Sequence, residues 1–87
     1  MENVDTTPQL EDIYASDASE LEKLSLAFDV ITNTILKQSD HELEVLKALS
    51  DKDRLVKEQI KKSTVKHLRY VFNHCYTRIT GRQAWNE

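Results

Sequence analysis

Apolar side chains recur along this chain every three or four residues, which is the spacing of one face of an α-helix. The clearest stripe consists of Leu21, Leu24, Phe28, Ile31 and Ile35. Ser19 or Asp17 can cap the amino end of this segment. Two glutamates follow in the first turn, where the helix dipole favours anions. The pattern predicts a helix over residues 18–37 that is packed along most of its length.

Two further capping signatures follow this stripe. A Ser–x–x–Glu capping box begins at Ser39 and predicts a short helix over residues 40–49. A second signature begins at Ser50 and predicts a third helix over residues 51–80. The alternative is one uninterrupted helix over residues 40–80, since that stretch holds neither Gly nor Pro. We favour a break near Ser50.

The last predicted helix carries its own apolar stripe, at a period close to 3.6 residues. Its members are Val56, Ile60, Val65, Leu68, Val71, Phe72, Cys75 and Ile79. Gly81 follows directly, and a glycine there suits the left-handed conformation that ends many helices. We expect the stripe over residues 21–35 to pack antiparallel against the second half of this one, from Leu68 to Ile79.

These elements predict an all-α fold: a small three-helix domain made of a long helical hairpin with a short middle helix. The single Gly and the single Pro of the chain support this prediction, because sheets and loop-rich folds use more turn residues. We expect residues 1–17 to form a flexible acidic arm, residues 18–81 the helical domain and residues 82–87 a C-terminal tail.

Charge is divided unevenly along the sequence. Residues 1–53 carry a net charge of −9, whereas residues 54–87 carry +6. Such a division favours either a basic element that contacts nucleic acid or an acidic protein, or two halves that neutralise each other within a bundle or dimer. A chain of 87 residues also buries only a small core. A homodimer is therefore expected.

The histidines and the cysteine do not form a recognisable reactive or metal-binding set. His67 and His74 are seven residues apart, roughly 10 Å along a helix, which is too far for two ligands of one ion. Cys75 aligns with the apolar stripe, so we expect it to be a small core residue. The sequence holds no catalytic or phosphate-binding motif. We therefore expect a protein without enzymatic activity, metal or cofactor.

The expected location is the cytoplasm. A single cysteine cannot form an internal disulfide, which favours a reducing compartment. The first residues are acidic and contain no apolar run of the kind found in targeting signals. No apolar stretch approaches the roughly 20 residues that a bilayer requires. The sequence therefore predicts a soluble protein with no membrane contact.

Binding to a protein is the function that the composition favours. Tyr, Trp and Arg are the residue types enriched at binding hot spots. They cluster near the C-terminus as Tyr70, Tyr76, Arg78, Arg82 and Trp85. The acidic arm adds Leu10, Ile13 and Tyr14 as candidate anchors. We predict a small regulator, inhibitor or adaptor that acts by stoichiometric binding of a protein partner.

The alternative is a nucleic-acid-binding regulator that uses the basic segment over residues 54–82. Its candidate phosphate contacts are Lys57, Lys61, Lys62, Lys66 and Arg69. The net charge of −3 weighs against this alternative, because nucleic-acid-binding domains are typically basic. The capping boxes and the apolar stripes are common to many helical proteins and specify no family.

Overall fold

The computed structural model describes residues 6–85, which form three helices. α1 covers Thr7–Ala15, α2 covers Glu20–Ala48 and α3 covers Lys52–Thr80. The described residues contain no strand, so the predicted all-α fold is confirmed. Residues 1–5 of the predicted arm and residues 86–87 of the predicted tail lie outside the described range.

α2 is one continuous helix, which corrects the prediction of two helices over residues 18–37 and 40–49. Ser19 caps it, as predicted, by accepting a hydrogen bond from the Glu22 amide at 3.2 Å. The helix continues through Ser39 because neither Gly nor Pro interrupts it there. In addition, the Ser39 hydroxyl has a hydrogen-bond partner on α3 and plays no capping role. A tertiary contact has overridden the local signature.

A turn at Ser50 separates α2 from α3, so the alternative of a single helix over residues 40–80 is wrong. Ser50 has a φ of 55°, in the left-handed region. Its amide donates to the Lys47 carbonyl, and the Asp51 amide donates to the Leu46 carbonyl, which is the Schellman arrangement. The Asp51 side chain then caps the amino end of α3.

α1 is the short helix of the fold, and it lies at the N-terminal end of the chain instead of in the middle. It contacts α2, and the Lys23 side chain donates a hydrogen bond to the Tyr14 carbonyl at 2.9 Å. Residues 1–17, predicted as a flexible arm, therefore include a packed helix. At the other end, Gly81 closes α3 with a φ of 76°, the left-handed conformation predicted for it.

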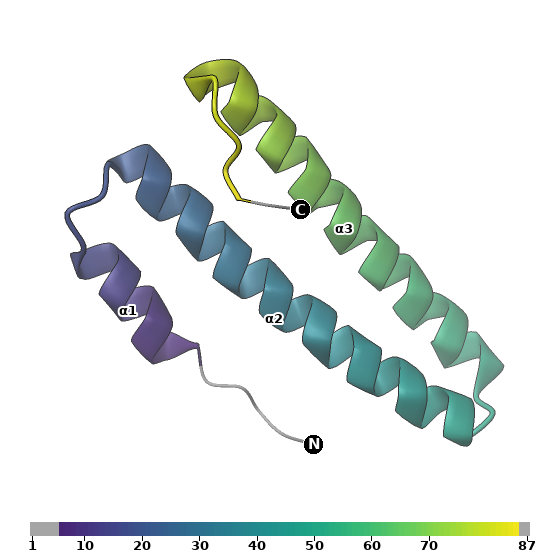
Figure 1. The fold of residues 1–87 in the computed structure, drawn as a ribbon. Helices are drawn as coiled ribbons and strands as arrows, with labels where there is room; N and C mark the ends of the chain where they lie inside the picture. The colour runs from purple at the N-terminus through teal and green to yellow at the C-terminus, as the bar shows by residue number, and fades with distance from the viewer. Residues whose placement is uncertain (1–5, 86–87) are drawn as a thin grey trace.

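The three helices lie side by side in one layer, with α2 between α1 and α3 (Figure 1). α2 and α3 run antiparallel as a hairpin, and the tail after Gly81 turns back along them. The molecule measures 46 × 28 × 15 Å, so the layer is about one helix thick. Domains usually enclose their core between two layers. Within residues 6–85 the second layer is missing.

Candidate protein-binding face

α2 and α3 face each other along positions spaced alternately three and four residues apart, which we call the seam. On α2 these positions are Ser25, Phe28, Thr32, Ile35, Ser39, Glu42 and Leu46, and on α3 they are Leu55, Glu58, Lys62, Val65, Arg69, Phe72 and Tyr76. All of them are buried or half-buried. The spacing matches helices packed at a small angle, as in helical bundles.

The seam is unusually polar. The buried polar residues among those described are Ser25, Thr32, Ser39 and Arg69, whereas the buried apolar ones are Ala27, Leu46 and Tyr76. Every buried side-chain nitrogen or oxygen atom in residues 6–85 has a hydrogen-bond partner. Burying such groups is tolerated only when they are paired in this way. The contact between α2 and α3 therefore depends on specific polar pairs.

Arg69 is the centre of the upper half of the seam, near the C-terminal end of α3. It is 5% exposed, and its guanidinium contacts the Asp29 carboxylate at 2.8 Å and donates to the Thr32 hydroxyl at 2.6 Å. The Thr32 hydroxyl in turn donates to the Phe28 carbonyl at 2.7 Å. One cation of α3 is thus held by an anion and a hydroxyl of α2, which fixes how the two helices align.

The C-terminal tail covers this arginine. The Trp85 ring lies 4.7 Å from the Arg69 guanidinium and stacks on Phe72 at 5.3 Å and on Phe28 at 6.0 Å. Phe28 and Phe72 stack on each other across the seam at 4.4 Å. The Ala84 amide donates to the Asn73 side chain and holds the tail along α3. Aromatic packing and a cation–π contact thus join the tail to both helices of the hairpin.

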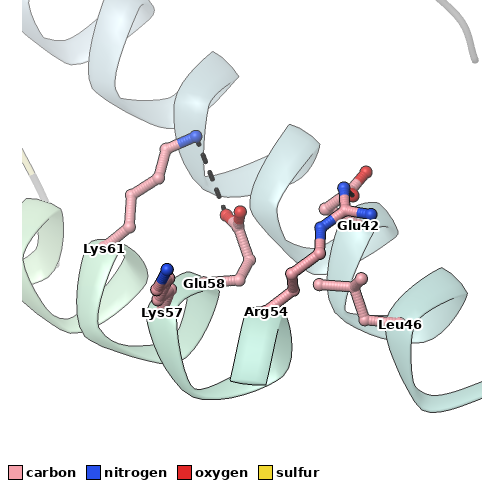
Figure 2. A pocket seen from close by; sticks show the side chains of 6 residues that line it. All are labelled: Glu42, Leu46, Arg54, Lys57, Glu58 and Lys61. Carbon is pink, nitrogen blue, oxygen red and sulfur yellow. Dashed lines mark ion pairs between the residues drawn. The ribbon is translucent and has the colours of Figure 1, made fainter. Parts of the chain in front are cut away.

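Charged pairs replace the aromatic rings in the lower half of the seam, near the turn between α2 and α3. The Ser39 hydroxyl donates to the Glu58 carboxylate at 2.6 Å, and Lys62 pairs with Asp40. Arg54 lies 3.6 Å from the Glu42 carboxylate. Figure 2 shows the shallow pocket of about 230 Å³ that opens here, lined by Glu42, Leu46, Arg54, Lys57, Glu58 and Lys61.

A polar seam leaves the predicted apolar stripes outside. Leu24 is 59% exposed, Leu68 51% and Ile79 72%, and Ile31, Val71 and Cys75 are exposed as well. The prediction that these exposed side chains join the two helices is therefore wrong, whereas Phe28, Ile35 and Phe72 lie in the seam as predicted. The period of the stripes was predicted correctly, and the direction they face was not.

Leu24 and Ile31 of the first stripe and Leu68 and Cys75 of the second lie on the same broad side of the hairpin, which we call the open face. An α-helix turns by about 100° per residue. Leu24 and Ile31 each precede a seam residue of α2, and Leu68 and Cys75 each precede a seam residue of α3. In two antiparallel helices, equal offsets from the contact line fall on the same side of the pair.

The opposite side of the hairpin carries the tail. Asp29 and Asn73 each follow a seam residue, so they lie on the side away from the open face. The tail bonds to Asn73, and Arg82 lies 3.5 Å from the carboxylate of Glu22. One side of the hairpin is thus ion-paired and covered by the tail. The other side is apolar in its half near the tail and is not covered by any described residue of α3 or the tail.

A groove continues the open face between α1 and α2. It has a volume of about 430 Å³ and is lined by Tyr14, Glu20, Lys23, Leu24, Ala27, Phe28 and Ile31. Most of this lining is apolar. Side chains of a partner that lay along α2 would find a preformed hollow here.

The predicted protein-binding residues do not form one surface. Tyr76 is 5% exposed and lies in the seam, and Trp85 packs inward on Arg69. Arg82 contacts Glu22 and lies 3.5 Å from the Tyr76 hydroxyl. The remaining two, Tyr70 and Arg78, are exposed on α3. Tyr70 stacks between His67 and His74 at 6.5 and 6.4 Å, which forms an aromatic row on the outside of the helix.

The predicted phosphate contacts are also divided. Arg69 is buried and paired, Lys62 pairs with Asp40, and Lys61 lies 3.7 Å from Glu58. Lys57 and Lys66 are exposed. Three of the five predicted cations thus contact carboxylates of this same chain.

The histidines and the cysteine do not gather into a metal site. No group of three or more His, Cys, Asp or Glu side chains in residues 6–85 is arranged to hold an ion. Cys75, expected as a core residue, is exposed on the open face. Within the same residues, none of the helices combines the length and the apolarity needed to span a bilayer.

Comparison with known proteins adds no functional assignment. No family model, no curated protein and no solved structure matches this chain. The site is therefore argued from the residues and contacts of the chain itself.

Proposed function

We propose that this chain is a small non-enzymatic module that binds a protein partner stoichiometrically and acts as a regulator, inhibitor or adaptor. The observation that carries the proposal is the open face. It presents leucine, isoleucine, valine and cysteine side chains of two long helices to solvent, beside an apolar groove. Contiguous apolar patches of this kind mark surfaces that another molecule covers.

The shape of the face supports a protein as the ligand. A layer one helix thick and 46 Å long presents a long, shallow surface instead of a deep cavity. Small-molecule sites are concave and enclose most of their ligand. Helical partners, in contrast, lay an apolar stripe into a groove between helices, with anchors at intervals of three and four residues. The open face has this form.

The distribution of charge supports the same proposal over nucleic acid. A phosphate backbone is bound by exposed cations along one surface. In this chain Arg69 and Lys62 of α3 pair with Asp29 and Asp40 of α2. Basic residues of the second half of the sequence are thereby paired with acidic residues of the first half, within the same molecule.

The proposal is tested by photo-crosslinking with a photoreactive amino acid incorporated at defined surface positions of the chain. A photoreactive amino acid at Leu68, which is 51% exposed, places the probe on the open face. The same amino acid at Leu26, which is 41% exposed, places it on the far side of α2. We expect protein adducts from position 68, saturating at one partner per chain, and loss of these adducts when Ile31→Glu is added. Equal or weaker crosslinking at position 68 than at position 26 would contradict the proposal.

A further inference from the structure

The open face consists of two facing rows of side chains, each with an interval of seven residues. The row on α2 is Leu24, Ile31, Gln38 and Val45, and the row on α3 is Cys75, Leu68, Lys61 and Arg54. Each of these residues directly precedes a seam residue. Because Phe28 stacks on Phe72 and Thr32 contacts Arg69, Leu24 lies level with Cys75 and Ile31 lies level with Leu68.

The two rows change character along the hairpin. Near the tail, Leu24, Ile31, Leu68 and Cys75 make the face apolar. Near the turn between α2 and α3, Lys61 and Arg54 make α3 cationic, and the Glu42 carboxylate of α2 lies beside Arg54 (Figure 2). An occupant of the whole face therefore needs an apolar half and a charged half in the same order.

We infer that the occupant is a second copy of this chain, related by a two-fold axis parallel to the helices. In this arrangement each level of the face meets the same level of the other copy. Leu24 then lies opposite Cys75 of the second copy and Ile31 lies opposite its Leu68. Nearer the turn, Gln38 lies opposite Lys61 of the second copy and Val45 lies opposite its Arg54. Apolar groups meet apolar groups in the half near the tail, and the Gln38 amide meets an ammonium in the half near the turn.

Net charge also selects this arrangement. α2 contains six acidic and three basic residues, a net charge of −3, whereas α3 contains two acidic and eight basic residues, a net charge of +6. A two-fold axis parallel to the helices places α2 of one copy on α3 of the other. A two-fold axis across the helices would place α3 of one copy on α3 of the other. Lys61 of one copy would then lie opposite Leu68 of the other. Like charges and buried unpaired cations disfavour that alternative.

The area and the layer count agree with a dimer. The layer measures 46 by 28 Å, so one side offers on the order of 1,000 Å², against the about 800 Å² per partner that stable interfaces bury. Two copies face to face give an antiparallel four-helix bundle with a two-layer core. The groove between α1 and α2 would then receive Val71, which is 40% exposed on the outer side of α3.

This inference rests on the proposed function, since it names the first protein that the open face binds. It leaves a second surface for the regulated partner. Tyr70 and the histidines stacked on it lie on the side of α3 away from the open face, so the dimer presents two copies of this aromatic row on its outside.

Analytical ultracentrifugation of the purified protein tests the inference. The chain has a mass of 10.1 kDa, and we expect about twice this mass at micromolar concentration. Leu68→Glu should weaken self-association at least tenfold, because it buries a charge in the apolar half of the interface. Leu26→Glu is the matched control on the far side of α2 and should leave the dimer intact. Circular dichroism confirms that both variants stay helical.

The arrangement is tested with Cys75, the natural cysteine of the chain. With Leu24→Cys, oxidation should link two chains through position 24 of one and Cys75 of the other, because facing positions on packed helices lie within disulfide range. Leu26→Cys should give no such link. A two-fold axis across the helices would instead place position 24 of one chain opposite position 45 of the other. A disulfide between two chains of the variant with Leu24→Cys, Val45→Cys and Cys75→Ser would therefore overturn the axis parallel to the helices.

If the protein remains a monomer at every concentration up to about 100 micromolar, the inference that a second copy occupies the open face is wrong. The proposed function would survive that result if photo-crosslinking from Leu68 still captured a different protein. If the protein is a monomer and Leu68 captures nothing, the proposed function fails as well. The two sets of measurements thus separate the two claims.

Discussion

The seam and the open face each depart from the composition expected of an inside and an outside. The seam buries an arginine, two serines and a threonine, whereas the open face exposes leucines, an isoleucine and a cysteine. Both are made by the same two helices, one residue apart along the chain. The difference shows that the best apolar stripe of a helix does not have to face its nearest neighbour in the chain.

The two regions divide two tasks. Buried polar pairs discriminate strongly between alignments, because a shift of one turn leaves a charge or hydroxyl without a partner. Apolar side chains provide association but little discrimination. In this chain the seam sets how α2 and α3 align, and the apolar surface is left for a protein partner. Predictions that break each region separately test this division.

The largest effect is expected from removing the cation at the centre of the seam. Arg69→Ala leaves the Asp29 carboxylate and the Thr32 hydroxyl without their donor and removes the group on which Trp85 lies. Breaking a buried pair costs 3–5 kcal/mol. Because the Asp29 side chain is 27% exposed and can be hydrated, we expect about 3 kcal/mol. Urea unfolding followed by circular dichroism measures it.

The control for this variant replaces both partners together. Arg69→Met with Asp29→Leu removes the charges in pairs and should recover most of the loss. If the double variant is as unstable as the single one, the seam would depend on the packing of the arginine stem and not on its charge.

Truncating one leucine in each region gives the second prediction. Leu46 is 2% exposed in the seam, so Leu46→Ala should cost about 2.5 kcal/mol through lost burial and a cavity. Leu24→Ala, on the open face, should change the stability of the monomer by less than about 0.5 kcal/mol. Thermal unfolding at low protein concentration makes the comparison. A loss for Leu24→Ala that equals the loss for Leu46→Ala would remove the distinction between the two regions.

The tail provides the third prediction. Trp85→Ala removes the stacking on Phe28 and Phe72 and the cation–π contact with Arg69. Each of these contacts contributes about 0.5–1.5 kcal/mol, so we expect a loss of about 2 kcal/mol. Arg78→Ala, exposed in the last turn of α3, should change stability by less than about 0.5 kcal/mol. Equal stability of the Trp85 variant and the wild type in urea would mean that the tail is not part of the seam.

Local sequence signals predicted the helix ends more reliably than the packing. Ser19 and Gly81 are used as predicted, and the helix break falls at Ser50 as predicted although Asp51, the next residue, supplies the cap of α3. A cap depends on hydrogen bonds to residues only a few positions away. Ser39 has the same signature and fails, because its hydroxyl meets Glu58 of another helix. Nothing within four residues of Ser39 carries that information.

The polar seam was not predicted, because the contact between α2 and α3 was inferred from the spacing of apolar residues alone. A second period is present in the sequence: Ser25, Thr32 and Ser39 are seven residues apart, and so are Lys62, Arg69 and Tyr76. Small hydroxyl residues at one heptad position let long side chains of the facing helix approach. That pairing becomes evident only when both helices are considered together, and the exposed Cys75 and buried Tyr76 follow from it.

The smallest effect is expected from a hydroxyl of the seam. Ser39→Ala removes the donor to the Glu58 carboxylate, which is then left half-buried beside Lys61. Losing a hydrogen bond to a charged group costs about 1.5–3 kcal/mol, and the remaining contact with Lys61 and the better helix propensity of alanine offset part of this cost, so a net loss of about 1 kcal/mol is expected. Thr64→Ala is the control, because the Thr64 hydroxyl bonds a carbonyl of its own helix and is exposed. Urea midpoints at equal slopes measure both. If the two variants lose the same stability, hydroxyls matter to this hairpin only through helix propensity, and the seam would owe its alignment to Arg69 and the aromatic rings alone.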